Sequence, residues 1–304
     1  MTLLDELFLT FPNAMTIESL QGSIENANFL VQDPLSDIFV VRTYLSKTPE
    51  EANQEITLLL SVSSNVKCSK PILKVGKEYI FFIGGYPCCA FEYIDGSHPK
   101  HEDLQLSLFN DLGKMLGFLH ISTRSFTYRT SWNEVETLHN AKELGNIFSD
   151  RIFNKLNSYI MDEIKLYESH FPLSSQFSAI LHADVDISNM IISKNTLSFF
   201  LIDFDDSTFG AVELDLAIAF RNLVLKSKNI SDYMQKAEQL LKGYRGITNY
   251  PIKNFGKWVR FSCFRYLVLM LYKSFQLLSY PSNNYINYLI WQKALKCEVS
   301  LNKL

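Results

Sequence analysis

The chain has 304 residues and a formal net charge of −3, and 47% of its residues are hydrophobic while 20% are charged. This length can bury one large core or two moderate ones. The small net charge gives no general attraction to nucleic acid or to an anionic membrane, so we expect a globular monomer or homodimer that binds a small molecule.

The amino terminus does not resemble a secretion signal, because acidic side chains stand where such a signal carries basic ones. No apolar run reaches about 18 residues without a charge, a glycine or a proline, so no membrane span is expected. The odd number and the spacing of the cysteines favour reduced, buried thiols at Cys68, Cys88, Cys89, Cys263 and Cys297. We therefore expect a cytoplasmic protein.

Strand patterns follow a short helix that ends before Pro12. Apolar runs bounded by turn residues predict strands at about 17–20, 28–31, 37–42, 71–75, 78–83 and 88–96. A helix interrupts them after Thr48-Pro49, since threonine caps a helix well and proline is favoured at its first position. The first part of the chain is therefore expected to be a small antiparallel sheet with one helix.

Beyond Pro99 the apolar residues recur at helical intervals, first between Leu104 and His120. The same spacing predicts further helices at about 132–145, 150–170, 231–244, 253–279 and 283–300. The second part of the chain is therefore expected to be mainly helical.

The most informative stretch lies among these helices, where His182-Ala183-Asp184 is followed by Asn189 and then, after two apolar runs separated by a turn, by Asp203. Phosphoryl transfer needs a carboxylate that orients and deprotonates the attacking hydroxyl, together with oxygen ligands for metal ions on the phosphates. Asp184, Asn189 and Asp203 supply these groups. The alternative is that they cap turns and end a strand, as these residue types often do.

This stretch resembles the catalytic loop and metal-binding motif of the aminoglycoside phosphotransferase, choline kinase and homoserine kinase group, which reads His-Gly-Asp-x-x-x-x-Asn and then Ile-Asp-Phe or Ile-Asp-Trp. Only Ala183 departs from it, in place of the glycine. The resemblance implies an α+β, protein-kinase-like fold of two lobes. It implies an amino-terminal nucleotide-binding lobe over 1–95, a hinge at about 91–96, and a helical catalytic and acceptor-binding lobe over 96–304.

The resemblance assigns roles to the candidate catalytic residues. Asp184 would be the general base, and Asn189 and Asp203 would bind Mg²⁺, with Asp205 as an alternative ligand. Asp215 resembles a buried carboxylate of the family that braces the catalytic loop.

The resemblance also implies a nucleotide site in the first part of the chain. Arg42 would contact the phosphates and pair with Glu55, while Lys47 is the alternative cation and a surface strand charge is the alternative role for Arg42. The turn at Gly22 and Ser23 would approach the phosphates, although a plain hairpin explains its sequence equally well.

Main-chain groups of Glu92, Tyr93 and Ile94 would hold the adenine, as in the hinge of the family. The expected function is Mg²⁺-dependent transfer of the γ-phosphate of ATP to a hydroxyl of an amino alcohol, a homoserine-like metabolite or an aminoglycoside. A stress-type Ser/Thr protein kinase of the same fold and a catalytically silent nucleotide-binding module remain alternatives. Other protein kinases are disfavoured, because residues 204–213 are too few for their activation segment.

Acidic residues flank the candidate catalytic residues at Asp186, Asp205, Asp206 and Glu213. They predict an acidic rim that suits a cationic acceptor, because a field of one sign concentrates oppositely charged ligands. The alternative is a solvated surface, where most acidic residues lie.

Overall fold

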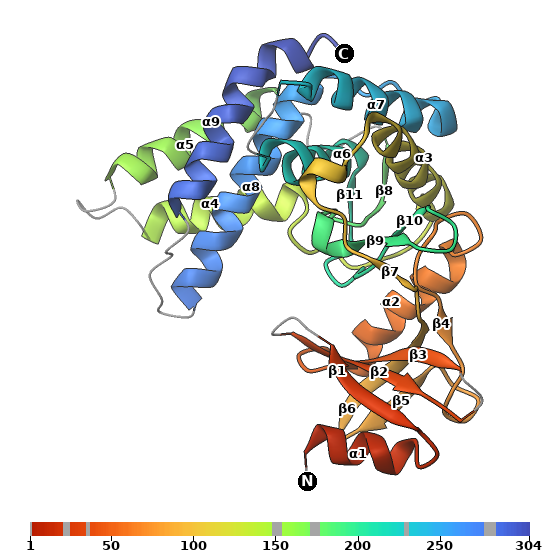
Figure 1. The fold of residues 1–304 in the computed structure, drawn as a ribbon. Helices are drawn as coiled ribbons and strands as arrows, with labels where there is room; N and C mark the ends of the chain where they lie inside the picture. Colours follow the sequence, from red (N-terminus) through yellow and green to blue (C-terminus); the bar gives the residue numbers. More distant parts are fainter. Residues whose placement is uncertain are drawn as a thin grey trace. The chain divides into compact units, whose positions relative to one another are not determined.

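The computed structural model describes residues 2–20, 25–34, 37–147, 154–170, 177–227, 231–276 and 284–304 (Figure 1). The chain divides into two compact units, one of Met1–Ser97 with Ile191–Ile202 and one of His98–Met190 with Asp203–Leu304. The first unit thus includes a segment that the sequence places in the second lobe. The reason is strand pairing, since β9 (Met190–Ser193) pairs with β7 (Gly96–Ser97).

An antiparallel sheet forms the first unit, as predicted. Its strands follow the order β1-β2-β3-β6-β4, and β5 also pairs with β6. The elements of this unit are α1 (Leu3–Thr10), β1 (Thr16–Leu20), β2 (Asn26–Gln32), β3 (Ile38–Tyr44), α2 (Pro49–Val62), β4 (Pro71–Ile72), β5 (Ile80–Ile83), β6 (Tyr86–Glu92), β7, most of β9, and β10 (Phe199–Leu201). Leu7 of α1 packs into the core with Val31, Val41 and Ala90 of the sheet.

The helix α2 begins where the sequence predicts. Thr48 Oγ1 accepts a hydrogen bond from the Glu51 N–H at 3.3 Å, and Glu51 Oε2 accepts one from the Thr48 N–H at 2.9 Å. This reciprocal pair satisfies two main-chain donors that a helix start leaves without partners. The inner face of α2 carries Glu55, which is 1% exposed among apolar neighbours.

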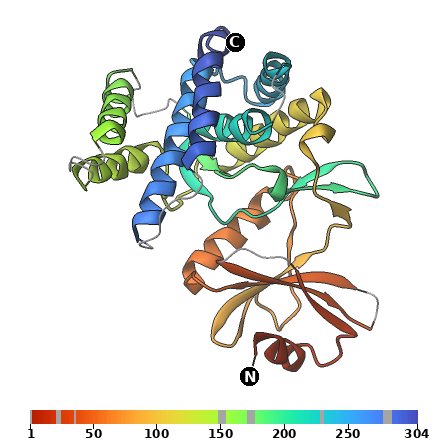
Figure 2. The same ribbon diagram turned by 60° about the vertical axis from the view of Figure 1, so that its left-hand side comes forward.

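The second unit is mainly helical, as predicted. Its elements are α3 (Leu106–Thr123), α4 (Glu134–Ile147), α5 (Asn154–His170), β8 (Ser178–Leu181), β11 (Thr208–Ala211), α6 (Val212–Phe220), α7 (Tyr233–Thr248), α8 (Phe255–Gln276) and α9 (Asn284–Leu301). Helices α8 and α9 run side by side in both ribbon views (Figures 1 and 2). Every residue of α6 is buried, so this short helix is the centre of the unit.

Two glycines allow α3 and α7 to pack closely. A methyl group on Gly243 would lie 1.9 Å from the main-chain oxygen of Asn110, and one on Gly113 would lie 2.1 Å from that of Leu240. No side chain fits at either distance, so the two helices contact each other through main chain. This close contact fixes His120, near the end of α3, relative to Tyr244 of α7.

The strands β8 and β11 pair antiparallel, with Leu181 opposite Thr208. The chain therefore leaves β8 towards residues 182–189 at the same end where it enters β11 from residues 203–207. This pairing, which the sequence did not predict, brings the two halves of the catalytic motif to one end of a small sheet (Figure 1).

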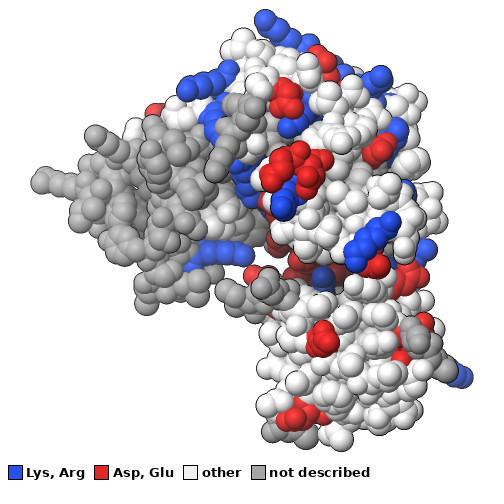
Figure 3. All heavy atoms as spheres, in the orientation of Figure 1, with Lys and Arg blue, Asp and Glu red and all other residues white. Residues whose placement is uncertain are grey.

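On the face drawn in Figure 3, Lys and Arg side chains and Asp and Glu side chains are interspersed, with broad uncharged areas between them. All five cysteines are buried and free, as expected. Among the helices within the described ranges, none is both long and apolar enough to cross a bilayer.

Candidate active site

The loop after β8 holds the side chain of Asp184 in a fixed position. Asn189 Nδ2 donates to Asp184 Oδ2 and to the Asp184 main-chain oxygen, both at 2.9 Å. Asn189 ends a single 3₁₀ turn, Ile187–Asn189, and is 8% exposed. Because its amide nitrogen faces Asp184, its Oδ1 is left as an oxygen ligand for a cation.

Two residues of this motif have left-handed main chain. Ala183 has φ +65°, at the position where the family motif has glycine, and Asp203 has φ +64°. A left-handed alanine costs roughly 1 kcal/mol more than glycine, so the departure at Ala183 is tolerated by its surroundings. Aspartate adopts this conformation more readily than most residues.

Burial raises the pKa of Asp184, and the charge of Asp206 raises it further. His182 and Arg221 act in the opposite direction, because positive charge favours the carboxylate. A carboxylate with a raised pKa is a better proton acceptor than an ordinary aspartate. The environment of Asp184 therefore suits a general base.

Asp215 braces the catalytic loop from α6. Its Oδ2 accepts from the His182 N–H at 2.9 Å and from His120 Nε2 at 3.0 Å, and its Oδ1 accepts from the Ala183 N–H at 2.9 Å. His120 in turn contacts the Tyr244 hydroxyl through Nδ1 at 3.0 Å. Burial would raise the pKa of Asp215, but the hydrogen bonds and charges of His120 and His182 outweigh it and lower the pKa.

We expect Asp215→Asn to destabilise the protein by about 3–5 kcal/mol, because it removes a fully buried charge and leaves donors on His182, Ala183 or His120 without an acceptor. The free energy of unfolding would be measured by urea denaturation. A carboxylate with a lowered pKa stabilises the fold above its unfolded pKa and loses this contribution as the pH falls through its folded pKa. The difference in unfolding free energy between the variant and the wild type should therefore become smaller at acidic pH.

Asp111→Asn is the matched control, since Asp111 lies on α3 with an exposed side chain and pairs only with Lys114 among the residues that the structure describes. It should change the unfolding free energy by less than about 1 kcal/mol. Equal destabilisation by the two variants would contradict the bracing role of Asp215.

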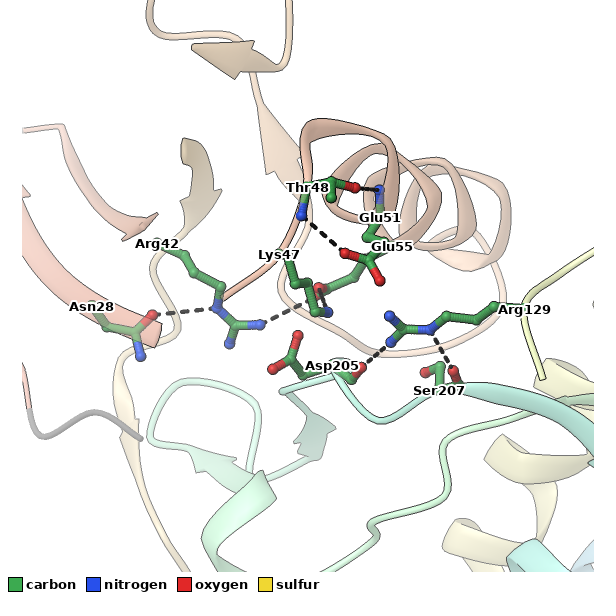
Figure 4. Close-up of polar contacts among 9 residues, drawn as sticks. All are labelled: Asn28, Arg42, Lys47, Thr48, Glu51, Glu55, Arg129, Asp205 and Ser207. Atoms are coloured by element: carbon green, nitrogen blue, oxygen red, sulfur yellow. Dashed lines mark hydrogen bonds and ion pairs between the residues drawn. The ribbon is translucent and has the colours of Figure 1, made fainter. Parts of the chain in front are cut away.

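Arg129 is a residue that the sequence did not single out. Its Nη2 donates to the Asp205 main-chain oxygen and its Nε donates to that of Ser207 at 3.2 Å (Figure 4). Phe209 N–H donates back to the Arg129 carbonyl at 3.0 Å. A guanidinium thus holds the segment that follows Asp203 by its carbonyl groups. No sequence pattern signals this, because the residues lie 76 and 78 positions apart.

If this segment presents metal ligands, Arg129→Gln should raise the Mg²⁺ concentration that supports half-maximal nucleotide binding by about tenfold, since two charge-assisted hydrogen bonds are lost. Fluorescence titration of a nucleotide analogue at a series of Mg²⁺ concentrations measures this. Arg124→Gln, which removes an exposed arginine near the end of α3, should leave the midpoint in place. Identical midpoints in wild type and Arg129→Gln would exclude the positioning role.

In the first unit, Arg42 and Lys47 share one carboxylate. Arg42 Nη1 lies 2.9 Å from Glu55 Oε1, and Lys47 Nζ lies 3.3 Å from Glu55 Oε2 (Figure 4). Arg42 Nε also donates to Asn28 Oδ1 at 3.3 Å. The expected pairing of Arg42 with Glu55 is thus present, but the same glutamate orients both candidate cations. Which of them binds phosphate stays a prediction.

The main chain of Glu92 is already engaged within the first unit. Its N–H donates to the Lys70 carbonyl at 2.8 Å, and its carbonyl accepts from Ser69 Oγ at 2.7 Å. Adenine recognition by the main chain of Glu92, Tyr93 and Ile94 stays a prediction. Gly22 and Ser23, the predicted phosphate turn, lie outside the described residues.

The predicted acidic rim is not what the structure contains. Glu213 is 6% exposed and accepts a hydrogen bond from the Tyr250 hydroxyl at 2.9 Å. Asp186 Oδ2 forms an ion pair with Lys226 Nζ at 2.5 Å. Of the four acids, only Asp206 is exposed. The four acids therefore do not form a continuous acidic surface that would favour a cationic acceptor.

The candidate metal ligands, Asn189 and Asp203, each carry a side-chain oxygen that can bind a cation. No group of three His, Cys, Asp or Glu side chains in the described ranges could hold a metal by itself. An amide oxygen and one carboxylate nevertheless suit Mg²⁺, which usually takes one or two protein oxygens and completes its shell with phosphate oxygens and water. The residues present fit a metal that arrives with a nucleotide.

Comparison with known proteins adds independent information. A model of the phosphotransferase enzyme family matches residues 16–247. No curated protein sequence matches the chain. Among solved structures, an amicoumacin kinase in complex with AMP-PNP, Ca²⁺ and its antibiotic superposes with a TM-score of 0.71 and 16% identity, over 91% of this chain and 88% of that one.

Two further structures are similar over almost their full length. A microcompartment-associated aminopropanol kinase gives a TM-score of 0.66 at 17% identity, with 98% of each chain covered. The choline kinase of Streptococcus pneumoniae gives 0.67 at 16% identity, again with 98% of each chain covered. These likenesses confirm the predicted α+β, kinase-like fold.

Proposed function

Because the chain belongs to the phosphotransferase enzyme family, we propose that it transfers the γ-phosphate of ATP to a hydroxyl group of a small molecule. The observation that carries this proposal is the clamp on Asp184, whose carboxylate is held by Asn189 and has a raised pKa. The nucleotide in the amicoumacin kinase structure supports the choice of a nucleoside triphosphate as phosphate donor.

In the proposed reaction Asp184 accepts the proton of the acceptor hydroxyl as that oxygen attacks the γ-phosphorus. The bond between the γ-phosphorus and the bridging oxygen breaks, and ADP leaves. When bound, Mg²⁺ would neutralise the charge that develops on the phosphate oxygens. Asn189 and Asp203 would hold it. The hydrogen bonds from the Arg129 side chain to the carbonyl groups of Asp205 and Ser207 would keep the segment after Asp203 in place.

The first unit would bind the nucleotide. We assign phosphate contacts to Arg42 or Lys47, oriented by Glu55, and to the turn at Gly22 and Ser23. We also propose that main-chain groups of the hinge segment at 91–96 hold the adenine. Residues 1–95 would then be the nucleotide-binding part of the chain, and residues 96–304 the catalytic part. Because ATP and Mg²⁺ are supplied inside the cell, we propose a cytoplasmic site of action.

The proposal is tested by incubating the purified chain with Mg²⁺, ATP or GTP, and a panel of candidate acceptors while ADP or GDP release is followed. The panel contains amino alcohols, homoserine, hydroxy acids, sugars and aminoglycosides. Acceptor-dependent release of nucleoside diphosphate is expected. Phosphate that appears only on protein would favour a protein kinase, and nucleotide binding with no transfer would favour a silent module.

A further inference from the structure

An arginine in the middle of α8 is buried without a carboxylate beside it. Arg265 is 4% exposed, and its Nε donates to the Trp132 carbonyl at 2.6 Å. Within the described ranges no Asp or Glu oxygen lies within ion-pair distance of its guanidinium. Removing a guanidinium from water costs several kcal/mol unless a negative charge compensates it. The chain itself therefore supplies only part of what Arg265 requires.

A second buried arginine makes this requirement larger. Arg221 is 2% exposed, and its guanidinium donates to Asn222 Oδ1 and to the Ser262 carbonyl. Its Cζ atom lies 4.7 Å from the centre of the Tyr266 ring. These partners are neutral. Burial first, and the positive charge of Arg221 second, lower the pKa of Arg265 to about 10. Two buried cations thus repel each other inside one unit.

Hydrogen bonds link both arginines to the two halves of the catalytic motif. Arg265 donates to the Trp132 carbonyl, and the neighbouring Ser131 N–H donates to Thr208 Oγ1, in the segment after Asp203. The charges of Asp206, Asp184 and Asp215 also favour the protonated form of Arg265. Asn222, which Arg221 holds, donates to the Val185 carbonyl at 3.0 Å. The buried positive charge is therefore next to the candidate general base, where an acceptor must lie during transfer.

Another arginine of the same helix, Arg260, provides a comparison because it is paired with carboxylates of the chain. Arg260 pairs with Glu163 of α5 and lies 3.3 Å from Glu298 of α9. Two carboxylates are provided there, so the guanidinium is compensated within the chain. Among the described residues Arg265 has no such paired carboxylate, and the aspartates of the catalytic loop act on it through their charge alone. Its guanidinium can therefore pair with a further anion.

We propose that Arg265, reinforced by Arg221, binds an anionic oxygen group of the acceptor, either a carboxylate or a phosphate, so that the acceptor is a hydroxy acid or a phosphorylated alcohol. The planar fork of arginine fits both groups through paired hydrogen bonds. This inference rests on the proposed phosphotransferase function, and it reverses the charge that the acidic residues of the sequence suggest for the acceptor. Two of the acids that suggested a cation have partners of their own, because Asp186 is paired with Lys226 and Glu213 accepts a hydrogen bond from the Tyr250 hydroxyl.

Binding is measured first, without turnover. The full chain, saturated with a non-hydrolysable ATP analogue and Mg²⁺, is titrated calorimetrically with short hydroxy acids, with the diols and amino alcohols of the same carbon skeleton, and with glycerol phosphate. We expect at least one anionic ligand to bind tenfold or more tightly than its diol and its amino alcohol. A carboxylate preference and a phosphate preference are distinguished by which series responds.

The variants are Arg265→Gln, Arg265→Lys and, as a matched control, Arg260→Gln. Arg265→Gln should weaken the anionic ligand by about 10- to 100-fold and leave the diol unchanged, whereas Arg265→Lys should retain part of the preference. Arg260→Gln should lower stability but keep the preference. If Arg265→Gln does not fold, Arg265→Met takes its place, since methionine is a long, unbranched side chain without a charge or a hydrogen-bond donor.

The inference is overturned if no anionic ligand binds better than its diol, or if Arg265→Gln retains the full preference. Acceptor-dependent ADP release is then followed separately on the same proteins. Anion binding without phosphorylated product would contradict the proposed function and leave the anion site in place. Transfer to neutral or cationic acceptors alone would support the function and refute the anion site.

Discussion

Asp184→Asn is expected to lower turnover by about 10²- to 10⁴-fold, the usual contribution of a positioned general base. The fold and the affinity for ATP should stay nearly unchanged. The amide oxygen of an asparagine can still accept the hydrogen bond that Asn189 Nδ2 donates to Asp184 at 2.9 Å. Only the ability to take the proton of the acceptor is lost. Turnover under saturating ATP and acceptor measures the effect, with nucleotide affinity titrated in parallel.

The pH dependence of turnover provides the control. Burial first, and the charge of Asp206 second, raise the pKa of Asp184. A base must be ionised to act, so turnover should fall as the pH drops through this raised pKa, at higher pH than for an ordinary aspartate. This acid limb should be missing from the residual activity of Asp184→Asn. A variant with full turnover, or with the same acid limb, would exclude Asp184 as the base.

The sequence predicted those parts of the molecule that local patterns encode. The capping pair of Thr48 and Glu51 marked the start of α2, and apolar runs separated by a turn gave the hairpin of β9 and β10. The offsets between Asp184, Asn189 and Asp203 carried the motif, because a catalytic loop is short and continuous. In each case the interacting residues are near neighbours along the chain.

The sequence could not predict contacts between distant segments. β11 is only Thr208–Ala211, too short to stand out, and it becomes a strand because β8 pairs with it. Arg129 lies in an irregular segment, and nothing local links it to the carbonyl groups of Asp205 and Ser207. Long-range pairing of this kind depends on the tertiary fold.

Charge was the least reliable guide, because sequence does not report burial. Glu213 follows the motif and resembles a surface acid, yet it lies within α6 with the Tyr250 hydroxyl as partner. Arg221 and Arg265 stand in largely apolar segments, and nothing in the sequence indicates that the two charges are buried. Only the structure shows that these two cations are buried together, and this changes the expected charge of the acceptor.

Asp203→Ala is expected to abolish the Mg²⁺ dependence of nucleotide binding, if Asp203 is the carboxylate that joins the metal to the phosphates. A nucleotide analogue would be titrated with and without Mg²⁺ in the wild type and in the variant. Asp205→Ala is the matched comparison, since it removes the other candidate carboxylate from the same segment. The Asp205 main-chain oxygen, which accepts from Arg129, is present in both variants.

The left-handed main chain at Asp203, with φ +64°, has to be separated from the charge of its side chain. Alanine at this position costs roughly 1 kcal/mol of backbone strain, whereas asparagine tolerates the conformation nearly as well as aspartate. Asp203→Asn should therefore keep the stability of the wild type and still lose most of the metal dependence. Retained metal dependence in both Asp203 variants, with loss only in Asp205→Ala, would place the ligand two residues further along the chain.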